Sequence, residues 1–269
     1  MKISFSRILV PVDGSPQSMV AFRAAYFFTK SFKAQLTALH VDESKEVEKE
    51  LRQTLNEERT GIDFNFMQRS GAVYKEITRT AKETAIDLIV MGTHGVSGFE
   101  EFWMGSNAYK VVNSSTCPVL TMREDASVNE FKSIVLPIDT SFESRQKVPY
   151  AVKLAETFGA KVHALGVSSD NDKEADYKIT NYLRQTIENL QAHNIECTTE
   201  KRLGGNITNQ TITFAQEQKA DLIIIMTEQE LQIGSFFLGK YAQQMVNHSN
   251  IPVLSIPPRE DLILTDARL

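Results

Sequence analysis

Three glycines and a serine near residue 100 have a spacing that suits phosphate binding. Gly92 and Gly95 follow the apolar run Leu88–Met91, and nine residues then separate Gly95 from Gly105-Ser106. Glycine lets a backbone turn sharply and approach a ligand closely. A helix that starts at Ser106 would present free N–H groups and the positive end of its dipole, both of which favour a phosphate. The spacing therefore predicts a phosphate site built mainly from backbone N–H groups.

Acidic residues follow two other apolar runs. Asp13 comes directly after Ile8–Val12, and Asp42 comes directly after Leu36–Val41. In an open parallel sheet, ligands bind outside the carboxyl ends of the strands. Asp13 could contact such a ligand, or it could satisfy backbone groups of its own turn, as aspartate often does. Both interpretations stay open at this point.

The other polar residues do not form a catalytic pattern. The chain has no Gly-x4-Gly-Lys-Ser/Thr motif and no recognisable Ser-His-Asp grouping, so we expect no catalytic residue and at most slow phosphoryl chemistry. His94 lies inside the glycine pattern and could contact phosphate or cap the loop. His40, His163 and His193 lack metal-ligand spacing, so we interpret them as structural or surface groups and expect no metal site.

Composition and charge exclude several classes of protein. The 29 Lys and Arg residues and 34 Asp and Glu residues give a formal charge of −5, which argues against a nucleic-acid partner. No apolar run reaches the roughly 18 residues of a membrane span, and the first residues lack the pattern of a signal peptide. Cys117 and Cys197 are too few for a disulfide framework and are interpreted as packing residues. We therefore expect a reduced, cytoplasmic globular protein.

Short apolar runs alternate with amphipathic segments and must position these residues. In the first half we expect strands at residues 8–12, 36–41, 62–68, 88–91 and 119–122, and helices from residue 15 or 16 and at residues 43–59, 74–84 and 106–113. Such alternation indicates parallel βαβ units with helices on both faces of a sheet. The first half is therefore predicted to be a doubly wound α/β domain with about five strands.

The second half repeats this pattern in the same order. FSRILVPVDGS at 5–15 matches FKSIVLPIDTS at 131–141, IDLIVM at 86–91 matches ADLIIIM at 220–226, and CPVLTM at 117–122 matches IPVLSI at 251–256. A preserved order of blocks indicates a duplicated unit of roughly 130 residues. We predict domains at 1–124 and 131–258, joined by a linker at 125–130 and followed by a tail at 259–269.

The second half lacks the glycine pattern. We place Met226 and Thr227 opposite Met91 and Gly92, which makes the following loop one residue shorter than in the first half. Glu228 and Glu230 would then put carboxylates where phosphates should lie, and like charges repel. Gly239 remains, but Lys240 replaces the serine. We therefore expect that the second half does not bind ATP in this way.

These motifs resemble those of the universal stress protein family. The resemblance rests on ILVPVDGS, DLIVMGTHG, the spacing of Gly92, Gly95, Gly105 and Ser106, and CPVL, and it extends over both halves, as in a tandem member. The glycine spacing is typical of the ATP-binding branch. The resemblance implies two Rossmann-like domains of the adenine nucleotide alpha-hydrolase type, paired through residues 119–122 and 253–256 as a pseudo-dimer.

The resemblance also implies a set of site residues for ATP or a related adenine nucleotide, with or without Mg²⁺. The adenosine part is expected at Pro11, Val12, Asp13 and Val41; the ribose and phosphates at Met91, Gly92, His94 and Gly95; and the phosphates at Gly105, Ser106 and Asn107. Members of this branch usually have a hydroxyl residue at the position of Ala108, so tight triphosphate binding is less strongly implied than nucleotide binding.

Three hypotheses for function follow. In the first, the protein is a stress-response regulator whose conformation or assembly responds to an adenine nucleotide. In the second, it is a scaffold that acts through protein contacts without a nucleotide. In the third, it is a slow ATPase. The halves are expected to pair with each other, and a homo-oligomer and an unidentified protein partner remain open.

Overall fold

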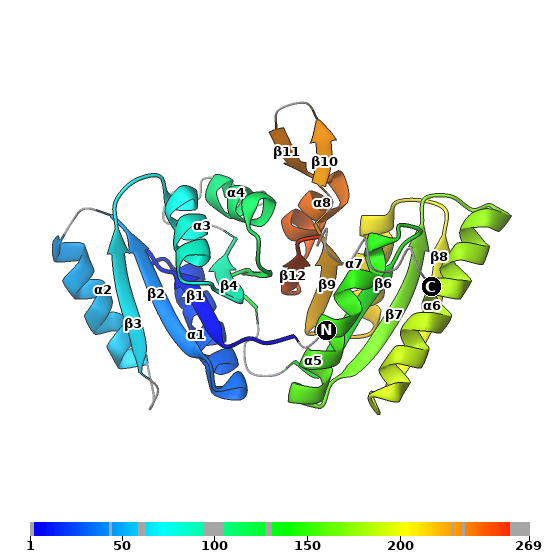
Figure 1. Cartoon of the computed structure of the whole chain (residues 1–269), viewed down its shortest axis with the longest axis horizontal. Coiled ribbons are helices and arrows are strands. Elements are labelled where there is room, and N and C mark those ends of the chain that lie inside the picture. The colour runs from blue at the N-terminus through cyan, green and yellow to red at the C-terminus, as the bar shows by residue number, and fades with distance from the viewer. Residues whose placement is uncertain are drawn as a thin grey trace. The chain divides into compact units, whose positions relative to one another are not determined.

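The fold is described from a computed structural model, which describes residues 3–42, 45–58, 63–93, 105–126, 131–227, 229–232 and 235–258. The chain groups into two compact units, Ser4–Asn129 with Val246–Pro252, and Met1–Ile3 with Glu130–Met245 and Val253–Leu269. Each unit contains a parallel sheet with helices packed against it (Figure 1). None of the helices within the described residues is long and apolar enough to cross a membrane.

The first unit alternates strands and helices as predicted. Its elements are β1 (Arg7–Pro11), α1 (Pro16–Phe32), β2 (Gln35–Val41), α2 (Lys45–Glu58), β3 (Phe64–Arg69), α3 (Val73–Glu83), β4 (Leu88–Gly92), α4 (Ser106–Ser114) and β5 (Val119–Met122). One boundary differs in a way that bears on the site. We expected the first strand to include Val12, but β1 ends at Pro11.

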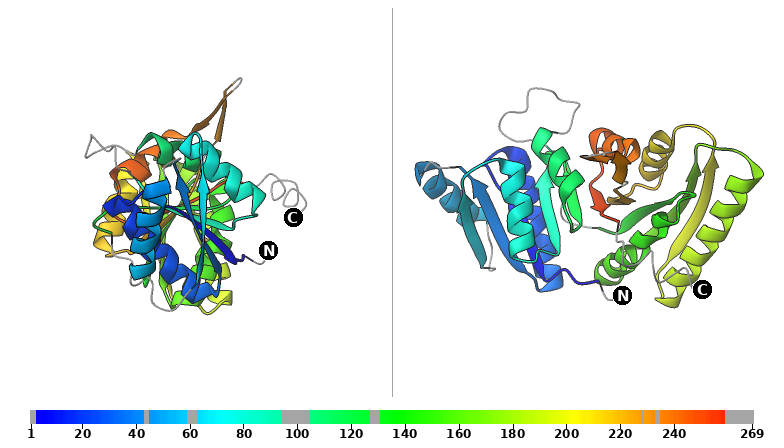
Figure 2. Two further views of the ribbon diagram at one scale, coloured as in Figure 1. Left: turned by 90° about the vertical axis from the view of Figure 1, so that its left-hand side faces the viewer. Right: turned by 45° about the horizontal axis from the view of Figure 1, so that its top comes forward.

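The strand order in the first unit is β3-β2-β1-β4-β5. The chain moves outward from β1 through β2 to β3 and then returns to β4 beside β1, so the order reverses between β1 and β4. Because parallel crossovers are right-handed, this reversal places α1 and α2 on one face and α3 and α4 on the other. The right-hand view of Figure 2 shows α1 and α3 on opposite faces of the sheet. A ligand site is expected at such a switch point.

The second unit repeats the architecture. Its elements are β6 (Ser133–Ile138), η1 (Glu143–Lys147), α5 (Val148–Phe158), β7 (Lys161–Ser168), α6 (Lys173–Ala192), β8 (Cys197–Leu203), α7 (Ile207–Glu217), β9 (Leu222–Met226), β10 (Gln229–Gln232), β11 (Ser235–Leu238), α8 (Lys240–His248) and β12 (Val253–Ile256). Its parallel strands have the order β12-β9-β6-β7-β8. Strands β10 and β11 form an antiparallel hairpin where we expected a loop.

Two aspartates fix how the repeats correspond. Asp87 Oδ2 accepts hydrogen bonds from the backbone N–H groups of Ser6 and Arg7, at 2.8 and 2.9 Å. Asp221 Oδ2 accepts from Lys132 and Ser133 at the same two distances. Asp87 and Asp221 therefore occupy equivalent positions and clamp the start of β1 and of β6.

This correspondence corrects the predicted alignment of the two loops by one residue. Thr93 N–H bonds to Met122 O at 2.9 Å, and Thr227 N–H bonds to Ile256 O at 2.8 Å. Thr227 is thus the counterpart of Thr93, and Met226 is the counterpart of Gly92. The carbonyl of Gly239 accepts the first hydrogen bond of α8, as the carbonyl of Gly105 does in α4. The loop from Thr227 to Gly239 therefore has the same length as the loop from Thr93 to Gly105. The loss of the first glycine, predicted on the other register, still holds.

The sequence explains where α1 begins and ends. Ser15 is the N-cap, and its hydroxyl accepts from Ser18 N–H at 3.2 Å, which satisfies one of the free donors of the first turn. Pro16 follows at the start of the helix, where a missing N–H costs nothing. Lys33 ends the helix in the left-handed conformation. The buried face of α1 includes Phe22 and Phe28, which places the helix firmly on the sheet.

Candidate functional site

A pocket of about 280 Å³ opens at the carboxyl ends of β1, β2 and β4 in the first unit. It also touches the first turns of α3 and α4. The lining consists of Pro11, Val12, Asp13, Ser18, Leu39, His40, Val41, Val73, Ile77, Met91, Gly92, Thr93, Gly105, Ser106, Asn107 and Ala108. The pocket therefore lies at the point where the strand order reverses, as expected for an open parallel sheet.

The structure gathers the predicted site residues that it describes around this pocket. They are Pro11, Val12, Asp13, Val41, Met91, Gly92, Gly105, Ser106 and Asn107. The predicted residues His94 and Gly95 lie outside the described residues. We had not included Ser18, Leu39, His40, Val73, Ile77, Thr93 and Ala108. The inward spacing of Ile77 on the helix after β3 was visible in the sequence, but not that this face borders the site.

Asp13 forms a turn with Ser15. One carboxylate oxygen accepts from the backbone N–H of Ser15 at 3.0 Å and from its hydroxyl at 2.6 Å. Asp139, at the equivalent place in the second unit, accepts from Ser141 N–H at 2.7 Å. Because both units share this turn, it accounts for an aspartate after the first strand without a ligand. Any contact of Asp13 with a ligand would come in addition.

Gly92 is required by the packing of a helix. A Cβ at this position would lie 2.9 Å from Gln17 Cβ, 3.0 Å from Gln17 C and 3.1 Å from Gln17 O. The first turn of α1 therefore sits directly against β4. In the second unit, the counterpart Met226 has a full side chain, and the equivalent of that first turn is the 3₁₀ helix η1. The glycine thus permits α1 to begin beside the pocket.

The N-terminus of α4 forms one end of the pocket. Gly105 N–H bonds to Thr93 O at 2.7 Å, and the first turn has no side-chain cap and no acidic residue. The side chains of Ser106 and Asn107 are exposed. The first N–H groups of a helix have no partner within the helix, and its dipole makes this end positive. This end of the pocket is therefore suited to an anionic group.

The opposite end of the pocket lies where β1 and β2 end. Val12 N–H bonds to Leu39 O at 2.9 Å, and His40 Nδ1 lies 2.8 Å from Val12 O. The His40 side chain is 4% exposed, and its Nε2 has no hydrogen-bond partner among the described residues. A buried polar atom without a partner typically costs about 1–3 kcal/mol. We had interpreted His40 as a structural or surface group; it is buried and lines the pocket.

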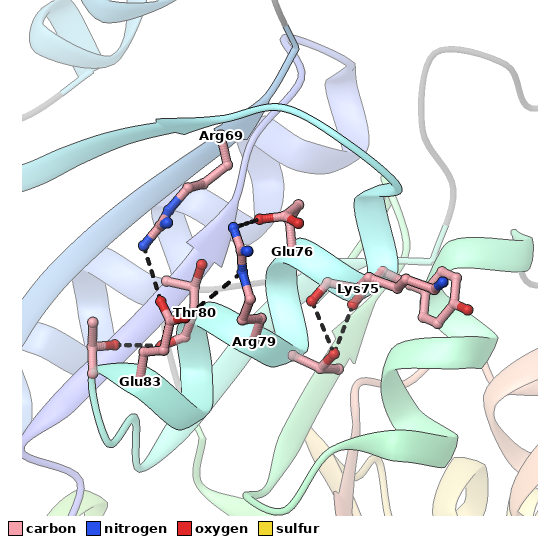
Figure 3. Close-up of polar contacts among 9 residues, drawn as sticks. Arg69, Lys75, Glu76, Arg79, Thr80 and Glu83 are labelled. Carbon is pink, nitrogen blue, oxygen red and sulfur yellow. Dashed lines mark hydrogen bonds and ion pairs between the residues drawn. The ribbon is translucent and has the colours of Figure 1, made fainter.

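Helix α3 is fastened to the sheet by an ion-pair cluster (Figure 3). Arg69 Nη2 at the end of β3 lies 3.1 Å from Glu83 Oε2 at the end of α3, and Arg79 bridges Glu83 and the buried Glu76. In the second unit, Arg202 pairs with Glu217 at the equivalent places. This shared pair positions the helix whose other face contributes Val73 and Ile77 to the pocket.

In the second unit, a helix and one larger side chain approach the equivalent region. Gly166 stands where the first unit has His40, and a Cβ there would lie 2.3 Å from Ile179 Cγ2 of α6. Tyr241 stands where the first unit has Asn107, and its hydroxyl lies 3.5 Å from Thr211 Oγ1, the counterpart of Ile77. Helix α6 and the Tyr241 side chain therefore approach positions that border the pocket in the first unit.

No group of three or more His, Cys, Asp or Glu side chains that could hold a metal ion occurs within the described residues. Burial raises the pKa of the Cys117 thiol to about 11, and Cys117 is buried behind Ser115. A thiol with so high a pKa has little thiolate at neutral pH, which fits the predicted packing role.

The chain matches known proteins over almost its whole length. The Universal stress protein family matches residues 4–60, 42–123 and 130–257. Universal stress protein YxiE of Bacillus subtilis is 33% identical in an alignment of 147 positions, which covers 44% of this chain and 99% of that protein. Universal stress protein MJ0531 of Methanocaldococcus jannaschii is 28% identical in an alignment of 143 positions, which covers 45% of this chain and 83% of that protein.

Solved structures resemble the whole chain. A universal stress protein from Archaeoglobus fulgidus has a TM-score of 0.74 at 22% identity, covering 96% of this chain and 99% of that one. The protein PA1789 from Pseudomonas aeruginosa, described as functionally unknown, has a TM-score of 0.73 at 17% identity, covering 98% of this chain and 96% of that one. At these identities the likeness concerns the fold, and it extends over both repeats.

Proposed function

The chain belongs to the universal stress protein family as a tandem member, and we propose that its first repeat binds an adenine nucleotide to regulate a stress response. The observation that carries the proposal is a pocket at the switch point of the first sheet that ends on the uncapped N-terminus of α4. One end of the pocket is suited to phosphate, and the other is bordered by apolar side chains and strand ends.

The phosphates would lie against Gly105, Ser106 and Asn107. The backbone N–H groups of this first turn are donors, and the dipole of α4 favours negative charge. The side chains of Ser106 and Asn107 are exposed beside these groups and can add hydrogen bonds. The predicted contacts of His94 and Gly95 with the phosphates also belong to this proposal. Local N–H donors would thus hold an anion in a protein whose formal charge is −5.

The adenosine part would lie between Pro11, Val12, Val41 and Met91. Val12 and Met91 are buried, and Val73 and Ile77 of α3 border the same space. Apolar side chains with a few convergent backbone groups are the usual composition of a small-molecule site. Since Asp13 already accepts two hydrogen bonds from Ser15, we assign it first to shaping the loop and second to the ribose.

Mg²⁺ would enter with the phosphates of ATP, since no cluster of metal-binding side chains occurs among the described residues. Phosphoryl transfer also needs a group that positions the attacking water. No described residue at the pocket is marked for that task, so the proposal is a binding and regulatory function. The bound nucleotide would favour one conformation or assembly state, which requires a different affinity for ATP in the two states.

Calorimetric titration with ATP and Mg²⁺ tests the proposal, with Ser106→Glu and Lys240→Glu as matched variants. Both positions are exposed and begin a helix, one at the pocket and one in the second repeat. A carboxylate at residue 106 should weaken binding about tenfold or more, which corresponds to about 1.4 kcal/mol. Glutamate at residue 240 should leave the ATP affinity unchanged. Because an acidic residue is favourable at a helix N-terminus, both variants should remain folded.

The absence of heat at high-micromolar ATP would reject the proposal and favour the scaffold hypothesis. Equal weakening by both variants would place the nucleotide elsewhere. Mass spectrometry of protein purified without added nucleotide should detect an adenine nucleotide in wild type and less in Ser106→Glu. A different compound in the wild-type protein would also overturn the proposal, because it would show what the pocket holds instead.

A further inference from the structure

The pairing between the first two strands of each repeat ends at different places. In the second unit, the register of β6 and β7 continues to the pair Ile138 and Gly166. In the first unit, the register of β1 and β2 ends one residue earlier, at Pro11 and Leu39. The counterpart of the pair Ile138 and Gly166 would be Val12 and His40. The ladder of the first repeat therefore ends just before this pair, in which histidine replaces the glycine of the second repeat.

The His40 side chain lies at the place where the ladder of the first repeat ends. In a parallel ladder, the next hydrogen bond would join the N–H of Val41 to Val12 O in the first repeat and the N–H of Val167 to Ile138 O in the second. In the first repeat that carbonyl is Val12 O, and His40 Nδ1 already lies 2.8 Å from it. A carbonyl accepts only, so Nδ1 must carry the proton and donate. A carbonyl can accept two hydrogen bonds, but the strand register ends before the pair that would bring the Val41 N–H to Val12 O, and the imidazole is the donor found at this carbonyl.

The Val41 amide is therefore left without its ladder acceptor. Val12 N–H bonds to Leu39 O, so Leu39 directs its peptide groups toward β1, and Val41, two residues on, does the same. Val41 and Val12 both line the pocket. In the second repeat the continued register gives the amide of Val167 the acceptor that Val41 lacks.

We propose that His40 is a positioning residue that holds the Val12 carbonyl so that the Val41 peptide group stays open to the base of a bound nucleotide. This proposal rests on the proposed function. It explains why a histidine whose buried Nε2 has no hydrogen-bond partner within the described part of the chain stands at the edge of the pocket. A buried group that costs stability calls for another reason to be there.

The open peptide group also predicts which base is preferred. An N–H donor and a C=O acceptor on one strand edge match the paired acceptor and donor of a 6-aminopurine, its ring N1 and its exocyclic amine. A 6-oxopurine presents the reverse pattern, with a ring N–H and an oxygen. A site built to hydrogen-bond one pattern discriminates strongly against the other, because the buried peptide groups would be left unpaired.

The test compares wild type with His40→Leu and His40→Asn in the full chain. Leucine fills the space without a donor, so Val41 N–H should bond to Val12 O and the ladder should extend. Asparagine places an amide donor near the position of Nδ1 and should preserve the wild-type arrangement. The readouts are amide hydrogen exchange at Val41 and the dissociation constants of ATP and inosine triphosphate. Val167 serves as the internal control for a ladder-bonded amide.

We expect the Val41 amide to exchange at least tenfold faster than that of Val167 in wild type, and ATP to slow it. In His40→Leu the Val41 amide should be protected without ligand. ATP affinity should then fall about tenfold, with the preference over inosine triphosphate lost, while the melting temperature stays equal or rises. His40→Asn should behave as wild type. A purely structural histidine would instead lower the melting temperature and leave the base preference intact.

Two results separate this inference from the proposed function. Suppose that wild type binds neither nucleotide but that the Val41 amide exchanges fast in wild type and slowly in His40→Leu. The proposed function then fails, while the effect of His40 on the Val41 amide is supported. If wild type binds ATP and His40→Leu binds it equally well with the same preference, the inference about His40 is overturned and the proposed function stands.

Discussion

Replacing Gly92 by alanine should disturb the first repeat even without a ligand. The added Cβ would lie 2.9, 3.0 and 3.1 Å from three atoms of Gln17, where ordinary van der Waals contact is 3.4–4 Å. Two of these atoms belong to the backbone of α1, so no side-chain movement removes the overlap. Overpacking of this kind typically costs about 1–3 kcal/mol. At about 2–4 °C per kcal/mol, the first repeat should melt roughly 2–12 °C lower.

The assay must report on the first repeat alone, since a two-unit chain need not unfold in one step. Residues 5–42 are described and belong to the first unit, so hydrogen exchange of peptides from this range, read by mass spectrometry as the temperature rises, provides that probe. Gln17→Ala is the matched control. It loses the hydrogen bond from Gln17 Nε2 to Glu124 Oε2, at 3.0 Å on an exposed site, and should have a small effect.

Combining Gly92→Ala with Gln17→Ala should not restore stability, because the Cβ and the backbone of residue 17 remain. Nucleotide affinity should fall as well, since α1 contributes Ser18 to the pocket. The reasoning would be refuted if Gly92→Ala melted within about 1 °C of wild type and lost only its affinity. In that case the glycine would serve the ligand and not the helix.

Two further predictions concern the second unit and the cysteines. Gly166→Ala should lower the free energy of unfolding by about 1–3 kcal/mol, because its Cβ would lie 2.3 Å from Ile179 Cγ2. In the double variant with Ile179→Ala, the loss of unfolding free energy should be smaller than the sum of the two single losses by about 0.5–3 kcal/mol. Strictly additive losses in chemical denaturation would disprove the contact. At pH 8, iodoacetamide should modify Cys197 well before Cys117. Burial raises the pKa of both thiols, to about 11 for Cys117, but Cys117 is buried and Cys197 is partly exposed, so Cys117 is the less accessible thiol; faster labelling of Cys117, read by mass spectrometry, would contradict its burial.

The sequence predicted most helices and strands to within a few residues because long apolar runs and amphipathic spacing determine them locally. It predicted the end of β1 wrongly: the strand ends at Pro11, and the carbonyl of the next residue, Val12, lies 2.8 Å from His40 Nδ1, a contact with a distant residue that local patterns do not reveal. The β10–β11 hairpin was also missed. Nothing in the local pattern separated it from a loop.

The candidate site was predictable where it depends on glycines and strand ends, and less so where it depends on packing. Val73 and Ile77 border the pocket because α3 lies on the same face of the sheet as α4, which follows from strand order and not from local sequence. The register error between the loops arose from matching Met226 with Met91 by residue type. The backbone bonds of Thr93 and Thr227 identify the correct partners.

The duplication lets the chain serve as its own comparison between what the fold needs and what the pocket needs. Both units keep an aspartate that clamps the first strand, and both join the end of the third strand to the following helix with an arginine–glutamate pair. These contacts lie away from the carboxyl ends of the central strands. They are expected in any repeat that must fold, whatever it binds.

Three differences between the units fall at the pocket. His40 corresponds to Gly166, Gly92 to Met226 and Asn107 to Tyr241, and in each case the second unit brings in a bulkier group or lets a helix move closer. Other differences lie away from the pocket, such as the longer α6 in place of α2, so the position of the changes alone does not identify their cause. The three changes at the pocket alter the space available there while the aspartate clamp and the arginine–glutamate pair are kept, which fits the proposal that the first unit alone binds a ligand.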